Sequence, residues 1–325
     1  MHKGKVAAVC FVVLILLSAC TVKTEPDTVT VQLKWVHQAQ FAGFYVAEQM
    51  GFFAEENLDV EFLEGGSNIN PIDTVTSGVA DFAVSAPEEL VIAVSRGEDL
   101  KAIANIFQIN PVVFISMADS GITRPQDFIG KSVAVLGELD FEIQLHIMLD
   151  FLNISLDDLT LRQHTYGADE LTGGEVDVQA FYATGGLLRL RNEGYQVNLI
   201  YPGDFGVHLN GDCIITADAT LAENPDLTLR FLRALVKGWQ HAVEHEDQAV
   251  EATMRYALES DAVLQREMLT ASIPLISTGR EKIGSLDTQS WQTLHDALLD
   301  QGLITRSIPL EEVIDPSYVE RIYSE

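Results

Sequence analysis

Cysteines, basic residues and long apolar runs are scarce in this chain of 325 residues, and each scarcity argues against a class of protein. The three cysteines form no Cys-x-x-Cys pair and no cluster with histidine, which argues against a disulfide framework and a metal centre. Only 20 Lys and Arg oppose 48 Asp and Glu, a formal net charge of −28. Such an acidic surface repels phosphate backbones and anionic lipid, so nucleic-acid and polybasic membrane binding are not expected.

The one notable apolar run near the N-terminus is too short to cross a membrane. It extends over Val6–Leu17 and follows Lys3 and Lys5. A membrane-spanning helix needs about 20 apolar residues, so this run of twelve does not predict one. A positive start followed by a short apolar core is typical of a signal peptide, which we place at residues 1–19.

The apolar run ends in Leu-Ser-Ala-Cys at 17–20, which resembles the lipobox of bacterial lipoproteins. The resemblance implies cleavage before Cys20 and a lipid on its thiol, anchoring an extracytoplasmic protein to the cell membrane. Residues 20–28 are polar and contain a proline, as expected of a short tether. The alternative is an ordinary secretory signal with an incidental cysteine. Cys213, which precedes Ile214-Ile215, is predicted to be a buried structural thiol.

The remaining stretch of about 300 residues exceeds what one compact core usually holds, so two lobes are expected. Short apolar strands alternate with helical segments along it, the pattern of an α/β protein. The predicted strands are Val29–Leu33, Leu58–Leu63, Phe82–Val84, Ala102–Ile106, Val112–Met117, Val176–Tyr182 and Val197–Tyr201. Helices are predicted at Phe41–Met50, Ile72–Ser77 and Phe141–Leu152, and a long one after Asn224-Pro225.

Two places indicate that the chain passes between lobes. Asn110-Pro111 interrupts the pattern, and a second interruption lies near Gly206. We therefore expect residues 29–110 and 206–325, which include the C-terminal helices, to form one lobe, and residues 111–205 the other. A two-strand hinge of this kind places a ligand cleft between the lobes, at the carboxyl ends of their strands.

Several motifs resemble the THI5/NMT1-like solute-binding family. They are LKWVHQAQFAGFYVA at 33–47, GFF at 51–53, the Gly-Gly turn at 65–66 and GVADFAVS at 78–85. The resemblance covers roughly residues 29–260 and is most specific in the first hundred. It implies a type II periplasmic-binding-protein fold and delivery of a ligand to an ABC permease and its ATPase. Family ligands are pyrimidine precursors of thiamine and, in some branches, riboflavin.

The candidate ligand contacts combine ring faces with polar groups. Aromatic faces can stack on a flat heterocycle, amide and carboxylate groups can bind ring nitrogens or amines, and a Gly-rich turn exposes backbone N–H groups. In the first lobe the candidates are Trp35, Gln38, Phe41, Tyr45, Gly66, Ser67, Ser85, Glu88 and Asp212. In the second lobe they are Glu138, Asp140, Phe141, Tyr182 and Asp204.

A structural role competes with ligand contact at several of these positions. Trp35, Tyr45 and Phe41 are alternatively aromatic residues of the core. Glu88 is alternatively a carboxylate that complements the dipole of the helix it begins. Ser85 is alternatively a plain N-cap of the same helix.

One departure from the family pattern concerns the ligand. Thiamine-pyrimidine binders carry a Trp-Asn-aromatic-Glu segment after a Val-Asp-Ala strand, and its glutamate holds the aminopyrimidine. Here the corresponding residues 176–186 read VDVQAFYATGG and contain no glutamate. A precursor such as hydroxymethylpyrimidine or formylaminopyrimidine is the first expectation, and riboflavin or another flavin-like ring is the alternative.

The chain is not expected to be an enzyme and is not expected to hold a metal or cofactor. Fungal proteins of the same fold make the thiamine pyrimidine with iron and their own histidine, but they carry a cysteine-rich motif that this sequence lacks. A lipoprotein that senses its ligand for a membrane receptor is a further alternative, which the sequence does not separate from import.

Overall fold

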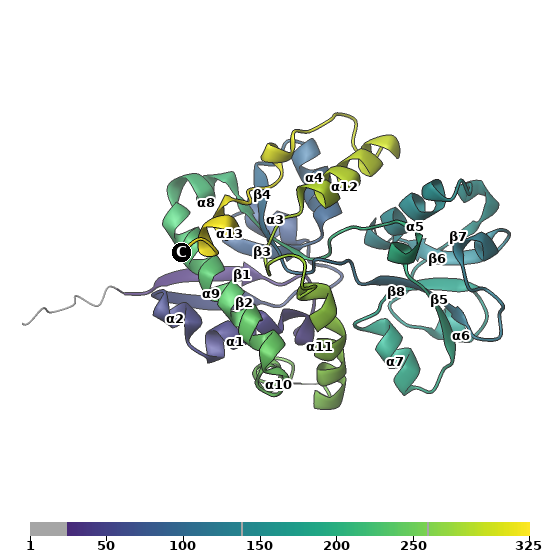
Figure 1. The fold of residues 1–325 in the computed structure, drawn as a ribbon, viewed down its shortest axis with the longest axis horizontal. Helices are drawn as coiled ribbons and strands as arrows, with labels where there is room; N and C mark the ends of the chain where they lie inside the picture. Colours follow the sequence, from purple (N-terminus) through teal and green to yellow (C-terminus); the bar gives the residue numbers. More distant parts are fainter. Residues whose placement is uncertain (1–24, 138, 259) are drawn as a thin grey trace, which may run out of the picture.

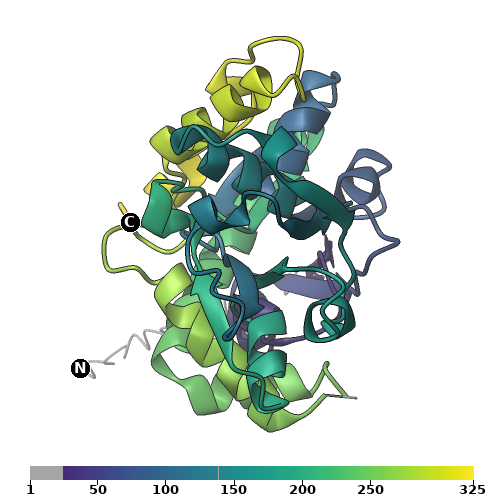
Figure 2. The same ribbon diagram turned by 90° about the vertical axis from the view of Figure 1, so that its right-hand side faces the viewer.

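The computed structural model describes residues 25–137, 139–258 and 260–325. The predicted signal peptide, Cys20 and Glu138 lie outside the described residues. Within these ranges, none of the helices combines the length and the apolar character needed to cross a membrane. The chain forms two α/β lobes that lie along the long axis of the molecule (Figure 1), and Figure 2 looks end-on at the second lobe.

The first lobe is built on a five-stranded sheet in the order β2-β1-β3-β10-β4. Its strands are β1 (Asp27–Gln32), β2 (Leu58–Leu63), β3 (Phe82–Ser85), β4 (Leu100–Asn105) and β10 (Cys213–Ala217). Strands β1, β2 and β3 are parallel, whereas β10 runs antiparallel to β3 and β4. The sheet therefore joins two segments of the chain that lie more than a hundred residues apart.

Helices cover both faces of this sheet. Those from the first segment are α1 (Ala42–Gln49), α2 (Phe52–Glu55), α3 (Pro71–Thr76) and α4 (Pro87–Ser95). Those from the last segment are α8 (Asp218–Glu223), α9 (Pro225–Glu244), α10 (Glu246–Met254), α11 (Ala262–Ile276), α12 (Thr288–Asp300) and α13 (Ser317–Ile322). The buried strand β3 is apolar on both faces, as expected of a sheet covered on both sides.

The second lobe has its own five-stranded sheet, in the order β7-β6-β8-β5-β9. Its strands are β5 (Val112–Met117), β6 (Ser132–Leu136), β7 (Thr160–Gln163), β8 (Val178–Tyr182) and β9 (Val197–Ile200). Strand β5 is antiparallel to both neighbours, and β6, β7 and β8 are parallel. Its helices are α5 (Leu139–Phe151), α6 (Asp169–Thr172) and α7 (Gly186–Asn192).

Two helices of the first lobe approach so closely that glycine is needed at their contact. A Cβ atom on Gly43 of α1 would lie 2.2 Å from the ring of Trp239 on α9. A Cβ on Gly238 would lie 2.3 Å from the carbonyl oxygen of Gly43. Both distances are well below van der Waals contact. This contact packs α9, from the C-terminal segment of the lobe, against α1, from its N-terminal segment.

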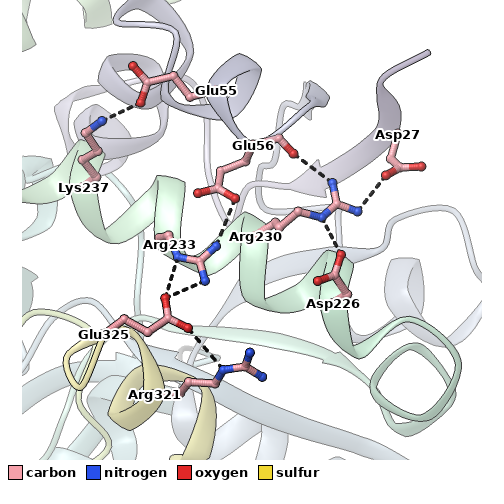
Figure 3. A network of polar contacts seen from close by, with 9 residues as sticks. All are labelled: Asp27, Glu55, Glu56, Asp226, Arg230, Arg233, Lys237, Arg321 and Glu325. Atoms are coloured by element: carbon pink, nitrogen blue, oxygen red, sulfur yellow. Dashed lines mark hydrogen bonds and ion pairs between the residues drawn. The ribbon is translucent and has the colours of Figure 1, made fainter. Parts of the chain in front are cut away.

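A network of surface ion pairs on α9 makes the same connection (Figure 3). Arg230 pairs with Asp27 at 2.7 Å, at the start of β1. Arg233 pairs with Glu56 at 3.0 Å, just after α2, and with Glu325 at 2.8 Å. Single exposed pairs contribute up to about 1 kcal/mol, so the network orients these elements more than it stabilises them.

The two connections between the lobes run side by side (Figure 1). The backbone N–H of Asn110 donates to the carbonyl of Leu209, and that of Gly211 donates to the carbonyl of Phe107, both at 2.9 Å. The side chain of Asn210 donates to the carbonyl of Gln108 at 2.9 Å. The hinge is therefore a hydrogen-bonded pair of segments. The boundaries at 110 and 205 that the sequence suggested for the lobes stay a prediction.

Candidate ligand-binding site

A cleft of about 350 Å³ lies between the lobes. Its wall on the first lobe follows strands β1 and β3, and its wall on the second lobe follows β6, β7 and β8. These are the carboxyl ends of parallel strands, where α/β proteins bind ligands. The polar and aromatic side chains that line it are Lys34, Trp35, Gln38, Gln40, Ser67, Glu88, Glu89, Asp140, Phe141, His164, Tyr166, Phe181, Tyr182 and Arg189.

Two aromatic rings face each other across the cleft. Trp35 follows β1 in the first lobe, and Tyr166 lies in the loop after β7 in the second. Their ring centroids are 5.0 Å apart and their planes are tilted by 42°. Tyr166 is 55% exposed, so little packing fixes its ring. The pair is placed to hold a flat ring between the lobes.

Lys34 forms a polar bridge from the first lobe to the second. Its Nζ donates to the hydroxyl of Tyr182 on β8 at 3.0 Å and pairs with Asp212 Oδ1 at 3.1 Å. Burial lowers the pKa of the ammonium, but Asp212, Tyr182 and Asp140 together outweigh it, and the pKa lies well above its usual value. Lys34 therefore stays charged, and this charge is already paired within the protein.

Asp212 and Asp140 anchor the two ends of this bridge. The amide of Gln40 donates to Asp212 Oδ2 at 2.5 Å. The hydroxyl of Tyr182 donates to Asp140 Oδ2 at 2.7 Å, and the amide of Asn110 donates to Asp140 Oδ1 at 2.9 Å. Burial raises the pKa of Asp140, against the lowering effects of Lys34 and these two hydrogen bonds. Because Asn110 belongs to one of the two connections between the lobes, the bridge joins the cleft to these connections.

Glu88 lies on the cleft wall at the first turn of α4 and is only 3% exposed. Its Oε1 atom is buried and has no hydrogen-bond partner among the described residues. Burial raises the pKa of this carboxyl well above its usual value, and Asp140 raises it further, while Lys34 opposes the shift. The cleft therefore contains an acid that tends to keep its proton.

The structure brings most of the sequence-predicted contacts together. Those that line the cleft are Trp35, Gln38, Gly66, Ser67, Glu88, Asp140, Phe141 and Tyr182. Asp212 does not line it, but it holds the side chains of Lys34 and Gln40, which do. Glu138 lies outside the described residues.

Four predicted contacts lie elsewhere. Phe41 and Tyr45 are at most 1% exposed, because the segment that carries them packs its aromatic face into the core, where Tyr45 stacks on Tyr256 with centroids 4.5 Å apart. Ser85 is fully buried in β3, and the alternative role as N-cap is wrong because Ala86 takes that position. Asp204 is exposed in the short 3₁₀ helix Pro202–Phe205, away from the cleft.

Sequence reasoning missed several residues of the cleft. Lys34 and Gln40 belong to the same motif as Trp35 and could have been found by asking which polar side chains follow the buried end of β1. Tyr166, His164 and Arg189 come from the second lobe, where no motif marks them. His164 and Tyr166 lie in the loop after β7 and Arg189 lies in α7, and neither segment carries a distinctive sequence pattern.

A second hollow, of about 500 Å³, lies on the outer surface around α10 and the start of α11. It is lined only by polar and charged side chains, among them Glu244, His245 and Gln248. Arg266 and Asp247 pair across it at 2.7 Å. It has neither aromatic faces nor strand ends, so the cleft between the lobes remains the candidate site.

Two α/β lobes, a double connection and a cleft at the strand ends make up the type II periplasmic-binding-protein fold. The periplasmic aliphatic sulphonate binding protein SsuA of Escherichia coli matches this architecture with a TM-score of 0.73, covering 88% of this chain and 91% of its own at 14% identity. The family model NMT1/THI5 like matches residues 38–249, and the chain belongs to this family.

Curated relatives match most of the chain. The riboflavin-binding protein RibY of Chloroflexus aurantiacus is 24% identical over 98% of this chain and 99% of its own length. The formylaminopyrimidine-binding protein of Halalkalibacterium halodurans is 26% identical over 86% and 88%. A 4-amino-5-hydroxymethyl-2-methylpyrimidine phosphate synthase of Legionella pneumophila is 25% identical over 77% and 80%. Of these three relatives, the two that cover more of the chain are named as binding proteins.

Proposed function

We propose that the protein is the extracytoplasmic solute-binding component of an ABC importer, and that it captures a small flat heterocycle for delivery to the permease and its ATPase. The observation that carries the proposal is the pair of rings, Trp35 and Tyr166, that face each other from opposite lobes in a cleft lined by polar side chains. Stacking of a base-like ring on one aromatic side chain contributes about 1–3 kcal/mol. The polar side chains of the cleft supply donors and acceptors for ring nitrogens.

A single-ring pyrimidine of the thiamine-precursor type fits this site best. The cleft of about 350 Å³ is near the lower end of the range for small-molecule sites, about 300–1,000 Å³. The relative named as a formylaminopyrimidine-binding protein supports the same ligand class. Trp35, Gln38, Glu88 and Tyr182 are the contacts we assign to it, because all four line the cleft.

Riboflavin is the second candidate ligand, because the relative named RibY matches nearly the whole chain. A three-ring flavin is larger than a single pyrimidine ring and would occupy more of the cleft of about 350 Å³.

A binding role is favoured over catalysis. Two relatives that match 86% or more of this chain are named as binding proteins, and those named as synthases match 77% of it or less. Cys213 is buried and donates to the carbonyl of Ser85 at 3.4 Å. Burial raises the pKa of its thiol well above the usual value, the opposite of what a nucleophile needs.

The experiment that tests the proposal is binding of a defined panel to the purified protein. Native mass spectrometry first identifies any retained ligand, and tryptophan fluorescence and thermal unfolding then follow titration with hydroxymethylpyrimidine, formylaminopyrimidine, thiamine, riboflavin, taurine and nitrate. At ligand a hundredfold above Kd, the protein gains about 2.7 kcal/mol of stability. Trp35→Ala should weaken binding about tenfold or more, whereas Phe151→Ala, an exposed aromatic outside the cleft, should not.

Two outcomes contradict parts of the proposal. Tight binding of taurine or nitrate without any response to ring compounds contradicts the ligand class. Import is separated from sensing by uptake of the identified ligand in cells, which must be lost when the gene for this protein is deleted. Unchanged uptake in the deletion strain contradicts import.

A further inference from the structure

The carboxyl of Glu88 is the most unusual polar group of the cleft. Glu88 is only 3% exposed, and its Oε1 atom has no hydrogen-bond partner among the described residues. A buried polar atom without a partner is unfavourable, so such an atom on a cleft wall is a position where a ligand can supply the missing hydrogen bond. An ordinary structural carboxylate would have both oxygens paired.

The charges around Glu88 oppose a second negative charge there. The groups that act on it come from the segment after β1, from α5, from β10 and from its own helix; they are Lys34, Asp140, Cys213 and Glu89. The one ammonium among them, on Lys34, is engaged by Asp212 and Tyr182. The carboxyls therefore outnumber the available positive charge.

Burial and the carboxylate of Asp140 raise the pKa of Glu88, while Lys34 and a hydrogen bond from the backbone N–H of Glu88 itself oppose the rise. The rise prevails, which agrees with the geometry: Glu88 is buried, and the neighbouring ammonium of Lys34 is already paired with Asp212. A neutral carboxylic acid has an O–H donor, which a carboxylate lacks.

We infer that Glu88 acts as a neutral acid whose O–H donates to a ring nitrogen or ring carbonyl of the ligand, so that binding requires the proton on this side chain. The inference rests on the proposed function and specifies its ligand as an uncharged heterocycle with an acceptor on the edge that enters the cleft.

This role makes the affinity depend on pH in one direction. Above the pKa of Glu88 in the free protein, each further pH unit leaves about tenfold less of the protonated form, and the apparent Kd rises about tenfold per unit. Buried glutamates reach pKa values of about 8–9, so the measurement should extend from about pH 5 to about pH 9.5. Below the pKa, the Kd for riboflavin, which has no group that titrates there, should be constant.

The experiment uses isothermal titration calorimetry of the full mature protein with hydroxymethylpyrimidine and with riboflavin across this pH range. Glu88→Gln keeps a donor of nearly the same shape but cannot titrate, so it should bind at neutral pH within a few-fold of wild type and show no loss at high pH. Glu88→Ala should bind weakly at every pH. Glu98→Gln, which changes an exposed carboxylate after the same helix, should follow the wild-type profile.

The outcomes separate this inference from the proposed function. A wild-type affinity that does not change with pH, or the same pH dependence in Glu88→Gln, overturns the role of the Glu88 proton while ring binding stands. Failure of both ring compounds to bind the wild-type protein at any pH overturns the proposed function and this inference together. Circular dichroism of each variant checks that it is folded.

Discussion

The ammonium of Lys34 and the hydroxyl of Tyr182 are 3.0 Å apart, although the two residues belong to different lobes and lie 148 positions apart in sequence. Lys34 also pairs with Asp212, and the hydroxyl of Tyr182 donates to Asp140, so the contact links the two acidic side chains. The lobes are thus connected by a polar bridge in the cleft as well as by the hinge.

Removal of the Lys34 charge should destabilise the protein. Lys34→Met leaves Asp212, which is 4% exposed at its side chain, with a buried charge that is not compensated. Loss of one partner of a buried pair costs about 3–5 kcal/mol, and the partial exposure of Lys34 favours the lower end. Lys131→Met breaks the exposed pair with Asp177 and should cost less than about 1 kcal/mol. Equal losses for the two variants in urea unfolding would contradict the bridge.

Glu88 should make the stability of the free protein fall as pH rises. In the unfolded chain Glu88 loses its proton near the usual value of 4.5, whereas in the folded protein it holds it to a higher pH. Between these values the folded state binds more protons, so stability decreases with pH, by about 1.4 kcal/mol per unit from this group. Glu88→Gln removes this loss, and its stability relative to wild type should increase with pH. A difference that is the same from about pH 4 to about pH 8 would refute this.

The sequence predicted where strands begin and end better than it predicted which strands pair with one another. The alternation of apolar residues located β1, β2, β5 and β9 within about two residues, because it depends only on which face of a strand is buried. It could not predict that β10 pairs with both β3 and β4, because that pairing depends on the return of the chain from the second lobe.

The same limit explains which site residues were found. Trp35 and Tyr45 are both aromatic and belong to one motif, yet Trp35 lines the cleft and Tyr45 is fully buried. The difference arises from the packing of α1 against α9 and α10, which are about two hundred residues away. Lys34 was missed because its role appears only when Tyr182 of the other lobe is placed beside it.

The close contact between α1 and α9 gives a further prediction. Gly43→Ala places a methyl group where the Trp239 ring now lies, at 2.2 Å, and the helices must separate. Overpacking of a core typically costs about 1–3 kcal/mol, and more where backbone must move. Gly167→Ala, at an exposed glycine with no atom within 4 Å of the new Cβ, should change stability by less than about 0.5 kcal/mol. Thermal unfolding of both variants tests the contact, and a Gly43→Ala protein as stable as wild type would disprove it.

Lipid anchoring at Cys20 is a prediction from the sequence alone. Cys20→Ser removes the thiol that would carry the lipid, so the protein should move from the membrane fraction to the soluble extracytoplasmic fraction. Cys213→Ser should leave the distribution unchanged, because this thiol is buried. Fractionation of cells with an antibody against the protein measures both. Retention of Cys20→Ser in the membrane fraction would show that another feature holds it there.

The aromatic pair gives the last prediction, which concerns Tyr166. A flat ring between Trp35 and Tyr166 makes two contacts of about 3.5 Å, so the centroids must move from 5.0 Å to about 7 Å apart. The exposed ring of Tyr166 can make this movement with little loss of packing.

If Tyr166 stacks on the ligand, Tyr166→Ala should weaken binding of the ring compound about tenfold, the equivalent of about 1.4 kcal/mol. Tyr166→Phe keeps the ring and should bind like wild type. Tyr201→Ala changes a partly exposed tyrosine outside the cleft and serves as the control. Titration calorimetry at one pH measures all three. Wild-type affinity in Tyr166→Ala, together with a loss in Trp35→Ala, would mean that only the first lobe supplies a stacking face and that the second contributes through its polar groups.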